Sequence, residues 1–362
     1  MPAPNAPSAV AGPQTIQNPT LFQQLTERQE MPQNPVNFPG LAKKSRIEIE
    51  KVGVIARARL IVNLKFKTHA EGVATLLPGW PWKLIRSVAL QSNGVTGILN
   101  ARGTTYQMRR ERIYRNPVRT VEEAPAIGAL EKNKSYSVRF LIEIPIAHDM
   151  LSLLGCLLAQ NEQTQLALEI VWAAENEMLS YTEGKTLTSI EGTLEWATTT
   201  FAIGETTEGN KTVTVLPDLS AFHGLLDESV PIVGSGEKKA PLIRTAGQLL
   251  AYTLTVMNGE TAQISPTAWS QFTLEYGGNK KPIVFQPPYN LLSENEDDYN
   301  GALSPGGVTY LCIDNEKDNP TRDLWIPEAL VELRSSTTIP AAVEVKEGAY
   351  LLYTQETLYP SS

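Results

Sequence analysis

The sequence predicts a mostly β protein built from two sandwich-like domains in tandem, preceded by an N-terminal arm. Three observations favour this fold class. Apolar and polar residues alternate with a period of two along much of the chain, few segments show a helical stripe, and 25 glycines and 25 prolines supply many turns. The 362 residues are enough for one large domain or two of ordinary size.

Composition and charge exclude several classes of protein. The net charge of -8 argues against a dedicated nucleic-acid-binding protein, which usually has a basic excess. No apolar run approaches the roughly 20 residues of a membrane span, and the first residues lack the basic start and apolar core of a signal peptide. We therefore expect the chain to be made in, and used from, the cytoplasm. Cys156 and Cys312 are expected to be free buried thiols, and no cofactor or metal site is predicted.

Residues 1–44 are predicted to form the arm, because the first forty are rich in Pro, Ala, Asn and Gln and cannot build a core. The segment TLFQQLTERQE predicts one short helix with Leu21, Phe22 and Leu25 on one side. An isolated helix needs about 12–15 residues for even weak stability in water. The helix is therefore expected to lie on another surface, and the alternative is a disordered tail.

The first domain is predicted to span residues 45–205. From Val54 to Phe66 the even positions are all apolar and most odd ones are polar or charged, which predicts the clearest strand of the chain. The segment LLPGWPW then breaks the pattern with two prolines and a glycine. LIRSVALQSNG predicts another strand, which ends at the Asn93-Gly94 turn.

Residues 134–173 join two strongly alternating strands through a helix-like insert. Side chains from both strands are expected to point into one core: Phe140, Ile142, Leu168 and Trp172. Arg139 is expected on the opposite face. Between the strands, Asp149 can begin a short helix in which apolar residues recur at helical spacing: Leu151, Leu154 and Leu158. A long crossover between half-buried strands favours a two-sheet sandwich.

The densest basic run of the chain, at residues 102–119, follows the strand LIRSVALQSNG and has Tyr106 and Tyr114 interleaved among its arginines. A nucleic-acid-binding patch is one interpretation, since arginines pair with phosphates and aromatic rings stack on bases. A charged helix face or a contact with an acidic neighbouring subunit is favoured instead, because the chain is acidic overall. Four residues are the candidates for inter-subunit charge contacts: Arg109, Arg110, Arg112 and Arg115.

The strand pattern starts afresh in the second half of the chain. After a Thr-rich strand pattern at residues 186–203, GETTEGNK is expected to be a linker. The second domain, with a C-terminal tail, is predicted to span residues 206–362. It contains strand patterns such as TVTVL, QLLAYTLTVM, QFTLEY, VTYLCI and AYLLYTQETL. The segment ENEDDYNG is expected to be an acidic loop.

Both halves resemble the major capsid proteins of tectivirus-type phages with an internal membrane. In the first half the similar features are a strand ending in IPIAHDM, a Leu-rich crossover with GCLLAQ, and the strand QLALEIVWA. In the second half they are TVTVLPDLS, an extended loop, QLLAYTLTVMNG and closing strands that end in AYLLYTQETLYP. The resemblance covers most of residues 45–356 and rests on the order and local pattern of the segments. It implies a double jelly roll, in which two eight-stranded jelly rolls follow one another.

The resemblance also implies a structural function, as the major capsid protein of an icosahedral virus with an internal membrane. Its implied partners are two further copies in a homotrimer, neighbouring capsomers, penton or minor capsid proteins and the internal viral membrane, without sequence-specific nucleic acid. Leu21, Phe22 and Leu25 of the arm are then expected to contact a neighbour or the membrane. The protein is expected in the virion, after assembly in the host cytoplasm.

Motifs for catalysis or ion binding are incomplete in this sequence. GETTEGNKT lacks the Gly-Lys step and the following helix of a phosphate-binding loop. The acidic segment at 296–301 lacks the closing glutamate of a calcium loop, because position 307 is glycine. Glu122 and Glu123 form only a carboxylate pair in sequence, whereas acid-base roles depend on their separation in space. No catalytic residues are predicted, and the chain is not expected to be an enzyme.

Two other classes of protein stay open at this stage. A virion spike or receptor-binding protein would also be all β, but it would be present in few copies per particle. A carbohydrate-active β-sandwich enzyme would need a cleft with paired carboxylates and aromatic platforms, for which the only hints are Trp80, Trp82, Trp269 and Trp325.

Overall fold

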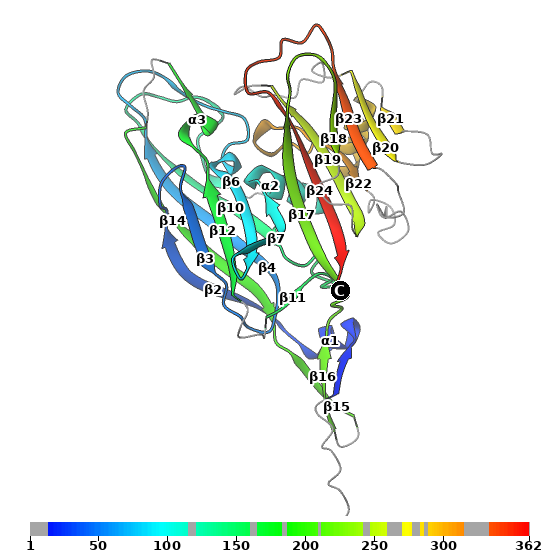
Figure 1. The fold of residues 1–362 in the computed structure, drawn as a ribbon. Helices are drawn as coiled ribbons and strands as arrows, with labels where there is room; N and C mark the ends of the chain where they lie inside the picture. The colour runs from blue at the N-terminus through cyan, green and yellow to red at the C-terminus, as the bar shows by residue number, and fades with distance from the viewer. Residues whose placement is uncertain are drawn as a thin grey trace, which may run out of the picture.

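Two β-sandwiches stand side by side, and a small three-stranded sheet projects below them (Figure 1). The computed structural model describes residues 14–114, 121–159, 165–182, 187–208, 211–241, 247–258, 270–276, 283–285, 289–314 and 333–361. In the part of the chain that it describes, no helix is long and apolar enough to cross a bilayer.

The first sandwich packs a five-strand layer against a four-strand layer. The five-strand layer has the order β2 (Arg28–Asn37), β14 (Ser189–Phe201), β4 (Val54–Lys67), β10 (Ser135–Pro145) and β8 (Val121–Glu123), and β11 (Leu157–Leu158) pairs with the start of β4. The other layer has the order β7 (Val95–Ala101), β6 (Ile85–Ser92), β12 (Leu166–Trp172) and β3 (Lys44–Glu48). The predicted strands at β4, β10 and β12 are confirmed.

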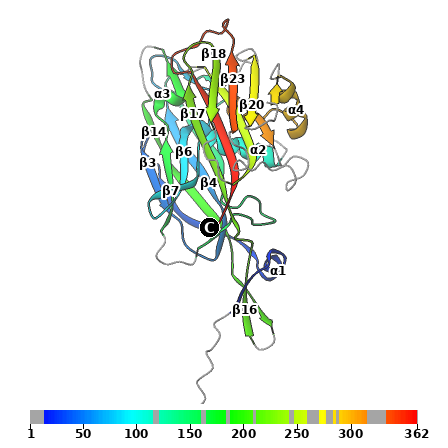
Figure 2. The same ribbon diagram turned by 45° about the vertical axis from the view of Figure 1, so that its right-hand side comes forward.

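The second sandwich has two layers of four strands. One has the order β22 (Leu311–Asp314), β19 (Gln248–Met257), β24 (Tyr350–Pro360) and β17 (Ala221–Pro231). The other has the order β18 (Gly236–Pro241), β23 (Leu333–Ile339), β20 (Gln271–Tyr276) and β21 (Ile283–Phe285). Figure 2 shows this second layer beside helix α4 (Tyr289–Tyr299). The segment expected to be an acidic loop thus lies largely in a helix, where Leu291 and Tyr299 face inward and the acidic residues face mostly outward.

One continuous sheet connects the two sandwiches. Strand β17 of the second sandwich pairs in parallel with β7 of the first, with Leu225 opposite Leu99 and Leu226 opposite Asn100. The four-strand layer that ends in β7 and the four-strand layer that ends in β17 therefore form a single eight-stranded sheet. Because backbone hydrogen bonds cross the boundary, the two sandwiches form one structural unit.

The core of the first sandwich contains the side chains predicted from the alternating strands. Phe140, Ile142, Leu168 and Trp172 belong to one buried cluster, and each is at most 1% exposed. The indole nitrogen of Trp172 donates to Ser45 Oγ at 2.9 Å, so its polar atom is also satisfied. Arg139 lies outside this cluster and its side chain is 41% exposed. The predicted faces of these strands are correct.

The insert between β10 and β12 contains turns where a helix was expected. Asp149 Oδ1 accepts hydrogen bonds from the backbone nitrogens of Leu151 and Ser152, each at 2.7 Å. This Asx-type turn satisfies the backbone locally and competes with a helix. Leu151 is 80% exposed, whereas Leu153 is buried with a φ of 56°. The helical spacing therefore predicted a buried side chain at Leu151, whereas the buried one is Leu153.

The three-stranded sheet below the sandwiches corrects the boundaries of the arm and the linker. We call it the foot; it consists of β1 (Gln14–Gln17), β16 (Lys211–Leu216) and β15 (Gly204–Glu208). The expected linker GETTEGNK thus supplies β15 and the start of β16. Residues 28–37, expected in the arm, form β2 and pair with β14. Most of the described part of the predicted arm is consequently integrated into the fold.

Smaller elements complete the chain. They are helix α1 (Pro19–Leu25) beside the foot, helix α2 (Gly103–Tyr114), the single turns α3 (Glu175–Met178), η1 (Trp82–Leu84) and η3 (Pro305–Gly307), and the sheet of β13 (Leu179–Tyr181), β5 (Ala74–Leu76) and β9 (Gly128–Ala129). The expected short helix of the arm is confirmed as α1. Its N-cap is Asn18, whose side chain accepts from Leu21 N at 3.0 Å.

Candidate functional site

Helix α2 lies at the junction of the two sandwiches and carries three arginines of the basic run: Arg109, Arg110 and Arg112. Tyr106 packs into the core of the first sandwich, whereas Met108 packs with side chains of β19, β22 and β24 in the second. Asp227 of β17 accepts hydrogen bonds from Arg102 N at 2.7 Å and from Thr105 Oγ1 at 2.8 Å. The helix therefore contacts both sandwiches along its length.

Buried ion pairs reinforce this junction. Arg109 Nε donates to Glu356 Oε1 of β24 at 2.6 Å, and Arg112 donates to the other oxygen, Glu356 Oε2. Arg112 Nη1 also lies 3.0 Å from Asp314 Oδ1 of β22. Burial alone would raise the pKa of Glu356, but the two guanidinium groups hold it well below its usual range. Glu356 therefore stays ionised in a nearly solvent-free site.

Two histidines complete this cluster, which we call the junction cluster: Arg109, Arg112, His148, His223, Asp314 and Glu356. His223 Nε2 lies 2.8 Å from Glu356 Oε1, and His223 Nδ1 lies 2.9 Å from Pro145 O. His148, His223 and Glu356 have the residue types of a metal site. Both oxygens of Glu356 already accept from guanidinium groups, however, and two adjacent positive charges repel a cation. The arrangement favours an ion-pair cluster over a metal site.

The arginines predicted to make inter-subunit contacts differ in how deeply they are buried. Arg109 and Arg112 are 5% and 2% exposed and pair within the chain, which differs from the inter-subunit role expected for them. Sequence periodicity could not distinguish a charged surface face from a face buried against a second domain. Arg110 is only partly buried and points toward Glu143. Arg115 lies outside the described residues.

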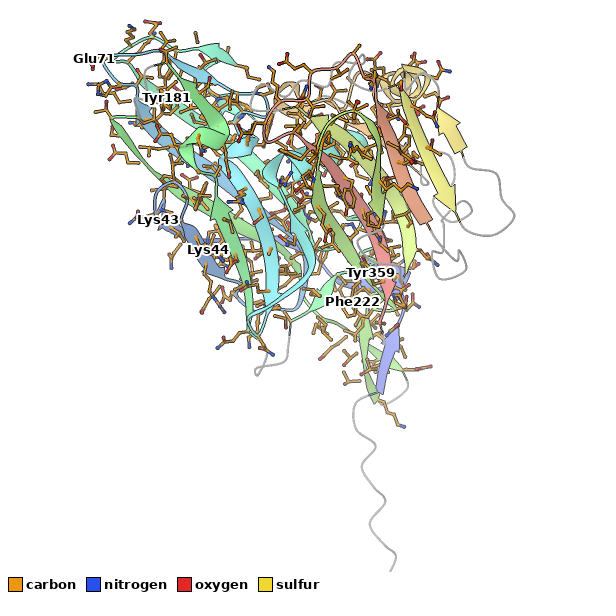
Figure 3. The ribbon with its side chains drawn as sticks, turned by 45° about the horizontal axis from the view of Figure 1, so that its top comes forward. Lys43, Lys44, Glu71, Tyr181, Phe222 and Tyr359 are labelled. Atoms are coloured by element: carbon orange, nitrogen blue, oxygen red, sulfur yellow. The ribbon has the colours of Figure 1, made fainter. Side chains whose placement is uncertain are left out.

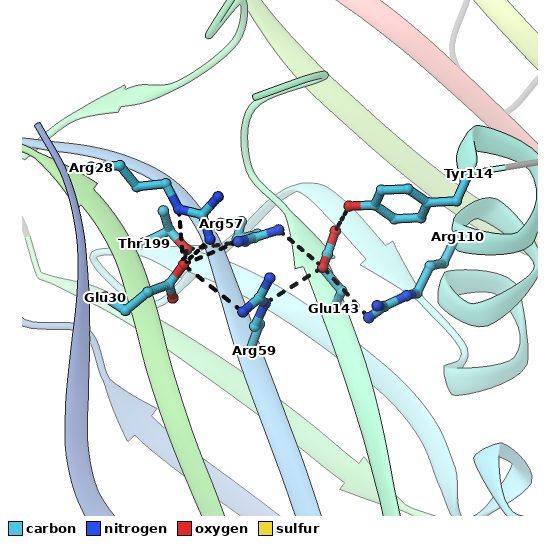
Figure 4. A network of polar contacts seen from close by, with 8 residues as sticks. All are labelled: Arg28, Glu30, Arg57, Arg59, Arg110, Tyr114, Glu143 and Thr199. Atoms are coloured by element: carbon cyan, nitrogen blue, oxygen red, sulfur yellow. Dashed lines mark hydrogen bonds and ion pairs between the residues drawn. The ribbon is translucent and has the colours of Figure 1, made fainter. Parts of the chain in front are cut away.

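A second polar network covers the outer face of the first sandwich (Figure 4). The buried Arg57 side chain lies between two carboxylates, 3.0 Å from Glu30 Oε1 and 3.2 Å from Glu143 Oε2. Arg59 approaches the same two carboxylates at 3.9 and 3.6 Å. Arg110 of α2 reaches Glu143 Oε2 at 3.5 Å, and Tyr114 donates to Glu143 Oε1 at 3.3 Å. The network joins β2, β4, β10 and α2.

Positive charge exceeds negative charge in this outer network. Arg28, Arg57, Arg59 and Arg110 surround two carboxylates, Glu30 and Glu143. Burial would raise the pKa of Glu30, but hydrogen bonds from Arg28, Thr199 and Arg57 lower it. Both acids therefore face more than one cation.

The three arm residues have different environments. Phe22 is fully buried in a cluster with Val54, Phe201 and Val215. Its ring centroid lies 6.3 Å from that of Phe201. Leu21 packs partly against this cluster, whereas Leu25 is 42% exposed. The apolar stripe of α1 thus docks on its own chain through Phe22, and Leu25 is the member that faces outward.

A groove of about 800 Å³ lies between the two sandwiches. Its described lining includes Arg102, Tyr310 and Tyr350, with Glu177 and Glu347 as its carboxylates. Trp80 and Trp82, considered as sugar platforms, are 4% and 7% exposed and do not line the groove. Trp269 and Trp325 lie outside the described residues. Trp80 and Trp82 therefore do not form the aromatic platforms that a carbohydrate-active enzyme would need.

The fold is a double jelly roll, as the resemblance implied. No family model and no curated protein matches the sequence. Among solved structures, the crystal structure of the STIV MCP, from Sulfolobus Turreted Icosahedral Virus, matches 92% of this chain and 97% of its own, with a TM-score of 0.65 and 13% identity.

Two further solved structures are similar over nearly the whole chain. The PBCV-1 virus capsid matches 92% of this chain and 93% of its own, with a TM-score of 0.62 and 8% identity. The major capsid protein P2 from bacteriophage PM2 matches 93% of this chain and 98% of its own, with a TM-score of 0.52 and 8% identity. At these identities the similarity establishes the shared fold.

Sequence reasoning did not identify Glu356, the centre of the junction cluster. It belongs to the closing strand, where nine consecutive residues, 351–359, are buried. Glu356 is the only charged residue within β24, YLLYTQETLYP. A buried carboxylate of this kind must be paired, so one charge inside an uncharged strand was the available signal.

Proposed function

We propose that the chain is the major capsid protein of an icosahedral virus, with a structural role, and that three copies form a pseudo-hexagonal capsomer. The observation that supports this most is the pair of jelly-roll sandwiches held side by side by one continuous sheet. Each chain therefore presents two similar lobes. Three copies around a threefold axis give six lobes, which fill a hexagonal footprint with closed symmetry.

The similar solved structures support the same function. Their names describe an MCP, a virus capsid and a major capsid protein, and each covers at least nine-tenths of this chain. The chain also covers more than nine-tenths of each of them, so the match includes both jelly rolls.

The junction cluster gives this proposal a mechanism based on rigidity. A lattice protein must hold its two lobes at a fixed angle, because errors in that angle accumulate around the capsomer. Here hydrogen bonds between β7 and β17 fix the register, and Glu356 links α2 to β24 through two arginines. Breaking such a buried pair is costly, so the two lobes move as one body.

The partners in this proposal are two further copies of the chain, neighbouring capsomers, penton or minor capsid proteins and an internal viral membrane. Arg110 belongs to the arginine-rich outer network and is our candidate for a charge contact between subunits. Leu25, with Leu21 beside it, is our candidate for contact with a neighbour or with the membrane, because Phe22 is occupied within the chain.

The proposed function can be tested on particles purified from cells that produce the virus. We expect this chain to be the most abundant protein of the particle by quantitative mass spectrometry, since a lattice protein must outnumber all others. A virion spike would be present in few copies. Finding the chain at spike-like abundance, or only in the host-cell fraction, would contradict the proposal.

A further inference from the structure

An apolar cavity of about 370 Å³ opens at the end of the first sandwich that lies next to the foot. Its described lining includes residues of β6, β7, β12, β11 and the start of β17. Its walls are formed by large apolar side chains: Leu90, Leu99, Ile146, Leu157, Leu166 and Phe222. Its volume lies at the lower end of the range for small-molecule sites, about 300–1,000 Å³.

The cavity continues the hydrophobic core of the first sandwich toward solvent. Leu99 and Ile146 are each 1% exposed and belong to that core. At the mouth, Leu158 and Phe222 are 36% and 39% exposed. Figure 3 shows Phe222 at the lower end of the molecule, close to the foot. Large apolar side chains exposed around an apolar cavity are typical of a binding site.

Charge at the cavity favours one kind of ligand. Among its described lining residues there is no acidic side chain, and the ionisable ones are Lys51 and His223. Both ring nitrogens of the buried His223 face oxygen partners in Pro145 and Glu356. Lys51 is partly exposed. A cation beside an otherwise apolar cavity attracts an anionic group attached to an apolar body.

We propose that this cavity binds a single-chain anionic amphiphile, the class to which fatty acids belong. The alkyl chain lies against the leucines of the cavity, and the anionic head group lies near Lys51. The size of the cavity favours one chain over the two chains of a phospholipid. The site lies within one chain, so binding does not depend on the shell proposed above.

The first test uses the full chain and straight-chain alkanoates as probes. Isothermal titration calorimetry with octanoate, decanoate and dodecanoate is expected to give saturable binding with one site per chain. Affinity is expected to rise about fourfold per added methylene, the factor typical of burying one such group. Absence of saturable binding, or an affinity that does not depend on chain length, would overturn the proposal.

Variants locate the site. Leu158→Asp places a carboxylate at the mouth of the cavity. Ser92→Trp replaces the exposed serine of the lining with a large ring. Each is expected to weaken dodecanoate binding at least tenfold. Val233→Asp is the matched control, because Val233 is an exposed apolar residue, 81% exposed, outside the described lining. Equal affinity in all three variants would show that the cavity is not the site.

A third comparison tests the role assigned to Lys51. Lys51→Gln is expected to weaken decanoate binding about tenfold while leaving the affinity for decanol unchanged. Circular dichroism and thermal melting of each variant check that it is folded. If Lys51→Gln weakens both probes equally, the head group is not recognised by charge and the anionic part of the proposal is wrong.

Discussion

Glu356 determines how the charged residues of the junction are arranged. It is 2% exposed, and each of its oxygens accepts from a different arginine of α2. Because its pKa is lowered in the folded chain, its contribution to stability is complete above the unfolded pKa of about 4.5 and is lost as the pH falls through the lower folded pKa. The contribution of Glu356 should therefore persist through mild acid and be lost only in strong acid, whereas the buried His223, whose pKa burial lowers to about 4, costs stability as the pH falls below its unfolded value of 6.5.

Replacing this carboxylate tests its contribution to folding. Glu356→Gln leaves the buried Arg109 without its counter-charge and Arg112 with only Asp314, so we expect a loss of about 3–5 kcal/mol in the free energy of unfolding at pH 7. Urea denaturation measures it. The difference from the unsubstituted chain should persist at pH 5 and shrink in stronger acid. Glu237→Gln, at an exposed ion pair, is the control and should have little effect. Equal losses in the two variants would contradict the account.

Both cysteines are free and buried, as expected from the sequence. Burial raises the pKa of Cys156 to about 12, so its thiolate is rare at neutral pH. Iodoacetamide at pH 8 should therefore modify Cys156 orders of magnitude more slowly in the folded chain than in urea. Mass spectrometry of timed samples measures both rates. Rapid modification of the folded chain would mean that the region around Cys156 opens frequently.

Alternating strands are the elements that the sequence predicts best. In β4, β10 and β12 a period of two and a buried face agree, so local pattern and tertiary packing select the same side chains. The predicted elements were wrong where local hydrogen bonds or strands distant in sequence determine the backbone conformation. Asp149 forms a turn with its own neighbours, and β15 exists because β16 pairs with it. Neither effect appears in the spacing of apolar residues.

The two faces of the first sandwich can be compared through Trp172 and Arg139. Trp172→Ala should cost about 3–5 kcal/mol of folding free energy, because it empties the core beneath β12. Arg139→Ala should change stability by less than about 0.5 kcal/mol in the isolated chain, since the side chain is 41% exposed and lies outside the core. Thermal or urea melting of the two variants measures this. Similar melting shifts would mean that the faces are assigned wrongly.

Helix α1 offers the corresponding comparison for the arm. Phe22→Ala should lower the free energy of unfolding by about 3–5 kcal/mol, because the ring is buried among Val54, Phe201 and Val215. Leu25→Ala should have a small effect in the isolated chain but reduce assembly if Leu25 contacts a neighbour. Urea denaturation and electron microscopy of assembled particles separate the two effects. If Phe22→Ala lowers the free energy of unfolding only slightly, the arm does not stabilise its own chain, and its contacts are with other molecules.

At the scale of the whole molecule, the strand patterns predicted two sandwiches and the family resemblance implied two jelly rolls, but neither showed how the two are joined. Arg109 and Glu356 are 247 positions apart, and their contact depends on how one sandwich sits against the other. The parallel pairing of β7 with β17 likewise depends on how the two sandwiches sit against each other. A single sequence contains no local signal for such contacts. The basic run and the single charge of β24 were both visible, whereas their pairing with each other was not.

The most direct test of the central claim is native mass spectrometry of the purified chain under assembly conditions. If two linked jelly rolls form a capsomer from three copies, the main species should have about 119 kDa, three times the 39.7 kDa of one chain. Negative-stain images of that species should show six lobes around a threefold axis. A chain that remains monomeric under these conditions, or whose oligomer lacks threefold symmetry, would contradict the account.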